Sequence, residues 1–220
     1  MKKPFYSIAL LIFLMPALAA CGKSYNYAAH LSEIRSDVFC AETEEFSVTV
    51  SCVSREYPYV TDGIACPKSD VIEISIVPVS VTPQDYSVYL LGGGEWGGEA
   101  SFRNYAGDWF YSESVASFPE ESVTLRVEWG EETRELTATS VKNADTLSVK
   151  DALGCAVKSE QPLIERLTQG GTFRGEFHVR LLRRNKNYYY VGIVDTEGHV
   201  LSLLLDAESG EVLARRETPA

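Results

Sequence analysis

The chain contains 220 residues, of which 45% are apolar and 23% are charged, and its formal net charge is −11. Nucleic acids and anionic lipid headgroups are bound by basic surfaces, so this acidic balance argues against either as a partner. The composition is typical of a folded protein, and the length is sufficient for one large domain or two small ones.

The N-terminal residues have the organisation of an export signal. Two lysines precede the apolar run Phe5–Ala17, which is shorter than the about 20 residues needed to cross a membrane. Residues 18–21 read Leu-Ala-Ala-Cys, which resembles the lipobox of bacterial lipoproteins. The resemblance implies cleavage between Ala20 and Cys21, a diacylglycerol on the Cys21 sulfur, and anchoring by several acyl chains. A simple secretory signal is the alternative.

We therefore expect an extracytoplasmic protein that is lipid-anchored to the bacterial cell membrane. Residues 1–20 would be the signal peptide, and residues 21–30 would form the tether. Removal of residues 1–20 takes away two lysines and no acid, which changes the formal net charge from −11 to −13. Nucleotide cofactors are not expected in this compartment, and no cofactor is predicted.

Four cysteines remain after Cys21, and an oxidising compartment permits disulfides between them. Four cysteines allow three pairings, and we favour Cys40 with Cys52 because they lie in neighbouring strand-like runs. Free buried thiols, which behave as small apolar residues, are an equal alternative. The spacings match no zinc-binding pattern. The four residues are Cys40, Cys52, Cys66 and Cys155.

Residues 31–146 have the periodicity of β-strands. Alternating apolar residues over 46–53 and 71–79 predict half-buried strands, and a first strand is expected from Ile34 onward. The run 122–141 alternates, turns at Gly130-Glu131 and returns, which predicts a hairpin. Recurring strands with turn-rich spacers favour an antiparallel β-sandwich of immunoglobulin-like type.

The character of the sequence changes in residues 147–217, which predict a smaller α+β unit. Ser148 is a candidate N-cap with an acid three residues later, and Pro162 is expected to open a second short helix that ends at Gly170-Gly171. Antiparallel strands are predicted next. They span residues 176–184, 188–195 and 199–206, with a last short strand near Val212.

The end of the chain resembles the PepSY domain. The resemblance is carried by a tyrosine-rich strand, a turn with glycine, and a strand that runs into an Asp-Ala turn. The matching residues are Tyr188–Val194, Gly198, Leu203–Ala207, Gly210 and Val212. PepSY units are associated with modulation of peptidases or with contacts at the cell surface, so the resemblance implies a role in binding a protein partner. Asp195 and Asp206 are interpreted as turn-forming residues rather than metal ligands.

An aromatic cluster follows the glycine-rich stretch GGGEWGG. Exposed aromatic rings with nearby polar groups stack on sugars, so this cluster is a possible glycan-binding surface, although packing in the sandwich is the stronger interpretation. The glycine stretch itself lacks the strand and helix context of a dinucleotide site. The candidate contact residues are Trp96, Tyr105, Trp109 and Tyr111.

No set of residues predicts catalysis or a metal site. The three histidines have no ligand spacing, and no serine lies in a nucleophile elbow. Residues 174–187 hold five Arg or Lys and one Glu. This basic run is interpreted as a solvated strand face and hairpin turn, with a contact for an acidic partner or for the membrane surface as the alternative.

We expect a non-enzymatic envelope protein that binds or modulates an extracytoplasmic protein, which could be a peptidase. Binding of peptidoglycan or another glycan through the Trp96–Tyr111 region is the alternative. A hydrolase would need a nucleophile or a carboxylate pair that the sequence spacing does not provide.

Overall fold

The structure is a computed structural model that describes residues 25–56, 66–80, 84–92 and 96–218. The predicted signal peptide and the predicted lipidation site, Cys21, lie outside these residues. In the described part of the chain, neither helix is long and apolar enough to cross a membrane.

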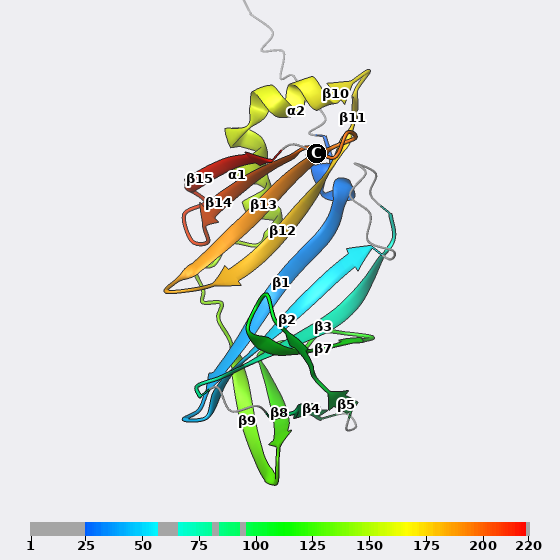
Figure 1. Cartoon of the computed structure of the whole chain (residues 1–220). Coiled ribbons are helices and arrows are strands. Elements are labelled where there is room, and N and C mark those ends of the chain that lie inside the picture. The colour runs from blue at the N-terminus through cyan, green and yellow to red at the C-terminus, as the bar shows by residue number, and fades with distance from the viewer. Residues whose placement is uncertain (1–24, 57–65, 81–83, 93–95, 219–220) are drawn as a thin grey trace, which may run out of the picture.

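Most of the described residues form strands, joined by a 3₁₀ turn and two short helices (Figure 1). The elements before residue 146 are η1 (Tyr27–His30), β1 (Leu31–Glu42), β2 (Phe46–Glu56), β3 (Lys68–Pro78), β4 (Tyr86–Leu91), β5 (Trp96–Glu99), β6 (Ser101–Arg103), β7 (Asp108–Ser114), β8 (Ser122–Trp129) and β9 (Glu132–Ser140). Those after it are α1 (Val149–Ser159), α2 (Gln161–Leu167), β10 (Thr168–Gln169), β11 (Thr172–Phe173), β12 (Gly175–Arg183), β13 (Asn187–Asp195), β14 (Val200–Asp206) and β15 (Val212–Thr218).

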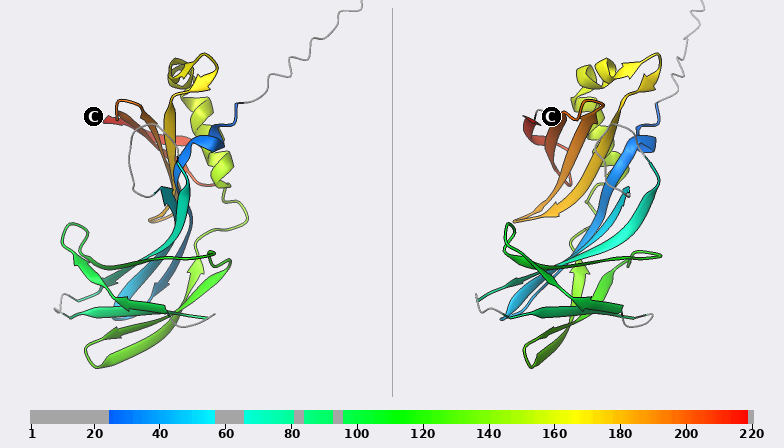
Figure 2. Two further views of the ribbon diagram at one scale, coloured as in Figure 1. Left: turned by 90° about the vertical axis from the view of Figure 1, so that its right-hand side faces the viewer. Right: turned by 45° about the vertical axis from the view of Figure 1, so that its right-hand side comes forward.

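The expected mainly β, sandwich-like class is confirmed. One large sheet runs in the order β15-β14-β13-β12-β1-β2-β3-β7-β6, and a second layer of β5, β4, β8 and β9 folds back onto it. The pairings are antiparallel except that of β1 with β12, which is parallel. Figure 2 shows the two layers of the sandwich, and α1 lying against one face of the strands β12–β15.

Strand β1 belongs to both halves of the molecule. Its first residues pair with β12, with Ile34 opposite Val179, and its last residues pair with β9, with Phe39 opposite Ser140. Its other edge pairs with β2 along the length of the strand. A bulge between Arg35 and Asp37 bends β1 where it passes from one half to the other.

The apolar residues form two buried cores on either side of this junction. One core lies inside the sandwich and includes Phe39, Phe46 and Ile74, which are 0% exposed. The other lies between α1, α2 and the strands β12–β14, and it includes Phe177 and Leu203. Val38, the neighbour of Phe39 in β1, belongs to this second core. Residues expected in the sandwich therefore contribute to both cores.

Local signals explain the helices and the hairpin. The Ser148 hydroxyl accepts a hydrogen bond from the Asp151 backbone N–H at 3.1 Å, which is the predicted N-cap of α1. Pro162 lies in the first turn of α2, where its missing N–H costs no hydrogen bond. Gly130 has a φ of 59° in the two-residue turn between β8 and β9, so the predicted hairpin is confirmed.

Residues 25–30, which were expected to belong to the tether, are part of the folded structure. Tyr25 and Tyr27 pack against the C-terminal core, and the Tyr25 hydroxyl accepts a hydrogen bond from the Phe173 N–H at 3.0 Å. His30 lies 2.9 Å from the same hydroxyl through its Nε2 atom. The folded part of the chain therefore begins at Tyr25 at the latest, beside the C-terminal half.

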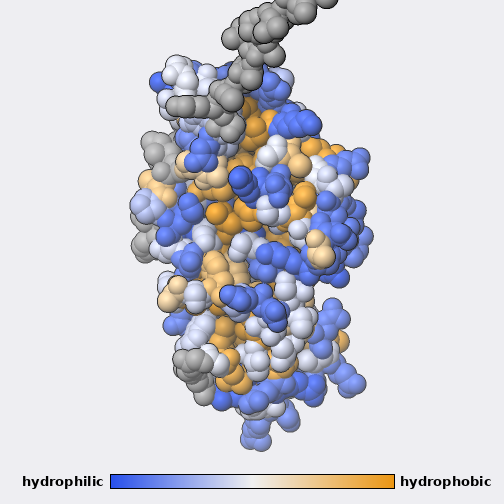
Figure 3. All heavy atoms as spheres, turned by 180° about the vertical axis from the view of Figure 1, so that it is seen from behind, coloured by the Kyte–Doolittle hydropathy of each residue, from blue (hydrophilic) through white to orange (hydrophobic). Residues whose placement is uncertain are grey.

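The side of the molecule behind the view of Figure 1 is not uniformly polar. Apolar residues gather along the middle of this face, and charged residues surround them (Figure 3). The large apolar side chains that are most exposed are few in the described residues. They are Val77, Val79, Phe102, Tyr105 and Leu213.

Truncation of Phe39 tests the importance of β1 to the sandwich core. Phe39→Ala should lower the free energy of unfolding by about 3–5 kcal/mol, because it opens a cavity in a fully buried site. Chemical denaturation measures the change. Tyr105→Ala is the control, since this ring is 86% exposed and its loss should change stability by no more than about 0.5 kcal/mol. Equal losses for the two variants would contradict the packing described.

Candidate functional site

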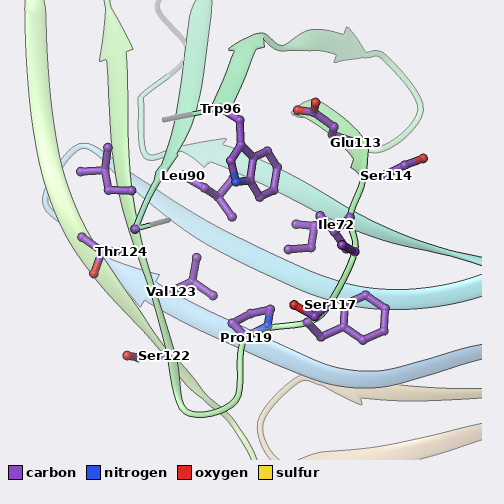
Figure 4. A pocket seen from close by; sticks show the side chains of 15 residues that line it. Ile72, Leu90, Trp96, Glu113, Ser114, Ser117, Pro119, Ser122, Val123 and Thr124 are labelled. Carbon is purple, nitrogen blue, oxygen red and sulfur yellow. The ribbon is translucent and has the colours of Figure 1, made fainter. Parts of the chain in front are cut away.

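A groove lies at one end of the sandwich, between its two layers (Figure 4). Its volume is about 600 Å³, and residues of β3, β4, β5, β7, β8 and the loop from β7 to β8 line it. Trp96 points into the groove from the first position of β5. The groove therefore combines one predicted contact residue with a loop that connects the two layers.

The position of Trp96 depends on a close approach between β4 and β5. Trp96 pairs with Leu90, and the next residue, Gly97, pairs with Tyr89. A Cβ atom at Gly97 would lie 2.0 Å from the Val88 carbonyl oxygen, and the φ of Gly97 is +154°. Only glycine fits here, so the glycine-rich stretch allows the short strand that carries the indole.

The groove has an apolar floor and a polar rim. Ile72, Leu90 and Val123 form the floor and are 1–5% exposed. The rim carries hydroxyl groups and one carboxylate, Glu113, which accepts a hydrogen bond from the Tyr111 hydroxyl. The hydroxyl residues are Ser114, Ser117, Ser122 and Thr124. An indole above an apolar floor with hydroxyls around it can stack a ring and form hydrogen bonds to its substituents.

The Tyr111 phenol serves the structure rather than proton transfer near neutral pH. Burial, together with the hydrogen bond and the negative charge of Glu113, raises the pKa of Tyr111 to about 12. The phenol therefore stays protonated and donates to the carboxylate.

The four predicted aromatic contacts do not form one surface. Trp96 lines the groove, but Trp109 and Tyr111 are half-buried and pack against the sandwich core. The Trp109 ring lies 5.6 Å from that of Tyr86. Tyr105 stands apart at the turn between β6 and β7, highly exposed, with the Arg103 guanidinium 5.7 Å from its ring centre. Packing in the sandwich, the stronger interpretation of the sequence, thus accounts for Trp109 and Tyr111.

Cys40 and Cys52 are not bonded to each other. All four cysteines of the described residues are free thiols. Cys40 is opposite Thr49 and Cys52 is opposite Asp37, so the two are out of register on β1 and β2. Their side chains also point to different sides, because Cys52 lies in the sandwich core and Cys40 packs against the C-terminal core. The favoured disulfide is therefore corrected to two separate thiols.

The histidines lie far apart and each has its own local contacts. His178 is buried beside Glu176, with Nε2 3.3 Å from the carboxylate. His199 contacts Asp195 at 3.1 Å, and His30 contacts Tyr25. Within the described ranges, no three His, Cys, Asp or Glu residues are grouped so that they could hold a metal ion.

Asp195 and Asp206 form the two turns of the C-terminal meander. Asp195 Oδ1 accepts hydrogen bonds from the backbone N–H groups of Glu197 and His199 at 2.8 and 3.0 Å. Asp206 Oδ1 does the same for Glu208 and Ser209. The ion pair with Lys186 and these backbone bonds hold the pKa of Asp206 well below its usual range. Both aspartates therefore act as the predicted turn-forming residues.

The C-terminal edge of the large sheet is open in the described structure. Strand β15 pairs with β14 from Val212 to Thr218, and it is the last strand in the order. Its side chains are mostly exposed. An extended chain could therefore add to this edge through main-chain hydrogen bonds.

The chain matches no family model, no curated protein and no solved structure.

The sequence indicated Trp96 as a contact residue but did not indicate the loop Val115–Pro119, which lines the opposite side of the groove. Its signal was present in the cluster of serines before Pro119, which marks a connection between strands. No local pattern shows that this connection borders a groove, because that depends on how the two layers pack.

Alkylation of the full chain without reductant tests the cysteine assignment. In the folded protein, iodoacetamide should modify the exposed Cys66 and leave Cys52 unmodified, because burial raises the pKa of the Cys52 thiol to about 12. After unfolding, Cys40 and Cys52 should both be modified, as detected by mass spectrometry of peptides. Protection of both after unfolding, reversed by reductant, would show the disulfide instead.

Proposed function

We propose that the chain is a non-enzymatic, lipid-anchored protein of the bacterial cell envelope that binds an extracytoplasmic protein through the edge strand β15. Anchoring is supported by the lipobox-like residues ending in Cys21. The PepSY-like residues of the last three strands support a protein as the partner, with an envelope peptidase as one such protein. The open edge of β15 is the observation that carries the proposal.

The edge has the chemistry to accept an extended, acidic segment. β15 offers seven residues whose outer backbone groups have no partner strand in the described chain. Arg215 is engaged by Glu160 and Glu217 at 3.1 and 2.7 Å. Arg216 is exposed and has no side-chain partner among the described residues. A partner strand with a carboxylate opposite Arg216 would gain a cross-strand ion pair in addition to the ladder.

The anchor would hold this edge close to the membrane. Only residues 22–24 separate the lipidated Cys21 from Tyr25, which packs against the C-terminal core. Four extended residues span at most about 14 Å. The C-terminal half, with β15, therefore faces partners that lie near the membrane, and the sandwich extends away from them.

Site-specific crosslinking tests this proposal. The full chain is expressed in its native bacterial cells with a photo-crosslinking amino acid in place of Arg216. It should form a covalent adduct with one defined envelope protein. The same amino acid at Glu131, in the exposed β8–β9 turn, is the control and should yield none. An identical adduct pattern at both positions, or no adduct from position 216, would contradict the proposal.

A pair of proline variants separates the edge from the fold. The backbone N–H groups of successive strand residues point to opposite edges of the strand. Of the variants Arg215→Pro and Arg216→Pro, one therefore removes an N–H group from the free edge of β15, and the other removes a hydrogen bond to β14. In both variants the crosslinking amino acid is placed at Thr218. The variant that keeps the thermal stability of the parent should no longer form the adduct. Retention of the adduct in both folded variants would exclude strand addition.

Glycan binding in the Trp96 groove is the second candidate. It is supported by the indole, the apolar floor and the rim hydroxyls, which suit a sugar ring. Trp96→Ala should weaken co-sedimentation of the protein with purified peptidoglycan at least about fivefold, since a stacked ring is worth about 1 kcal/mol. Trp109→Phe, outside the groove lining, should leave it unchanged. Equal binding by all three proteins would remove this candidate.

A further inference from the structure

A second cleft lies on the outer face of the large sheet, away from both β15 and the Trp96 groove. Its floor is formed by outward-facing residues of β1, β2, β3 and β7, and its wall by the last residues of β12. Its volume is about 470 Å³. The strands that form it can be followed in Figure 2, in which the β12–β13 hairpin projects over the junction of the two halves. Both halves of the molecule therefore build this cleft.

The cleft is basic in a strongly acidic chain. Four arginines line it, and Glu73 is the one acid among its lining residues. The Glu73 carboxylate is already shared, with Arg55 at 2.8 Å and Arg35 at 3.5 Å. Arg103 is neutralised by Asp108, whose Oδ1 accepts a hydrogen bond from the Arg103 Nε–H at 2.8 Å. Positive charge thus remains in excess in the cleft.

The excess belongs chiefly to the end of β12. Arg183 contacts only the Asn187 amide oxygen, at 3.3 Å, and Arg184 has no side-chain partner in the described part of the chain. Both residues are exposed and line the cleft, and they also border the adjoining hollow beside Glu42. Two adjacent guanidinium groups carry ten N–H donors between them, and within the described ranges the Asn187 amide oxygen is the one side-chain acceptor that they contact.

Arg35 lies on the floor and is itself incompletely satisfied. Its Nε atom is buried and has no hydrogen-bond partner among the described residues. Burial, with the nearby positive charges of Arg180 and Arg103, lowers the pKa of Arg35, although Glu73 opposes this effect. A negative group in the cleft would relieve this local imbalance of charge.

We propose that this cleft binds an anionic ligand that carries carboxylate or phosphate groups, held by Arg183 and Arg184 at the wall and by Arg35 at the floor. Guanidinium groups form paired, charge-assisted hydrogen bonds with both kinds of anion. Ser51 and Thr49 on the floor add hydroxyl donors, and Val77, Phe110 and Leu182 add an apolar side. The ligand that fits is a small molecule with one or more anionic groups. The site is independent of the partner proposed for β15.

Isothermal titration calorimetry of the full chain in detergent micelles tests the site with two probes. Tripolyphosphate represents the phosphates and citrate represents the carboxylates. At low ionic strength, at least one probe should bind with a submillimolar Kd, and the preferred probe identifies the anionic group. Binding should weaken as sodium chloride is raised, because salt screens partly exposed charges.

The double variant Arg183→Gln/Arg184→Gln should weaken binding at least about tenfold, since charge-assisted hydrogen bonds are lost. Its matched control is Arg166→Gln/Arg174→Gln, which removes the same charge from exposed sites elsewhere. The control should bind as the parent does. Arg35→Lys keeps the charge but loses the planar fork, and it should also weaken binding in a folded protein. Equal weakening in both double variants, or no binding of either probe, would overturn the proposal.

Discussion

Strand β1 is the element on which both halves of the structure depend. Its neighbouring residues Val38 and Phe39 point into different cores, because successive side chains of a strand alternate between the faces of the sheet. Its backbone pairs with β2 on one edge and with β12 and then β9 on the other. The ion pair of Arg180 with Glu33, formed by two hydrogen bonds of 2.6 and 2.7 Å, holds the parallel pairing with β12 in register. Removal of β1 would therefore leave neither core closed.

This shared strand also explains where the surface features lie. The arginine cleft exists because β12 follows β1 only as far as Arg180 and then diverges over the outer face of the sandwich. The Trp96 groove lies within the sandwich, where the β7–β8 loop closes the space between its layers. The open edge β15 is the terminal strand of the sheet order, three strands away from β12, which contacts η1. The three surfaces are formed by different residues, so a molecule bound at one of them would leave the other two uncovered.

Much of the fold follows from local patterns. The hairpin around Gly130, the Ser148 cap and the turns at Asp195 and Asp206 are specified by residues within a few positions of one another, and the structure contains each of them. The parallel pairing of β1 with β12 joins residues separated by 147 positions in the case of Glu33 and Arg180. No local periodicity specifies such a pairing. The packing of Tyr25 was missed for the same reason, since its partner Phe173 is 148 positions away in the sequence.

The sites were predictable only in part. Packing of the aromatic cluster in the sandwich was the stronger interpretation, but the sequence did not show which rings pack there and which line a groove, and the fold assigns Trp109 and Tyr111 to the first group. The Cys40–Cys52 pairing was wrong because proximity of two strands does not specify their register, and a bulge in β1 shifts it. The basic run of residues 174–187 was visible in the sequence. The cleft that it lines also contains Arg35 of β1, and only the fold brings Arg35 near Arg183 and Arg184.

Native-state hydrogen exchange across a denaturant series tests most directly whether β1 joins the two cores into one cooperative unit. The most protected amides of β3, in the sandwich, and of β13, in the C-terminal half, should converge on one free energy of opening and one dependence on denaturant. This is the result expected if neither core persists without β1. Two separate free energies, with β13 exchanging while β3 stays protected or the reverse, would show that the halves unfold independently and would contradict the account.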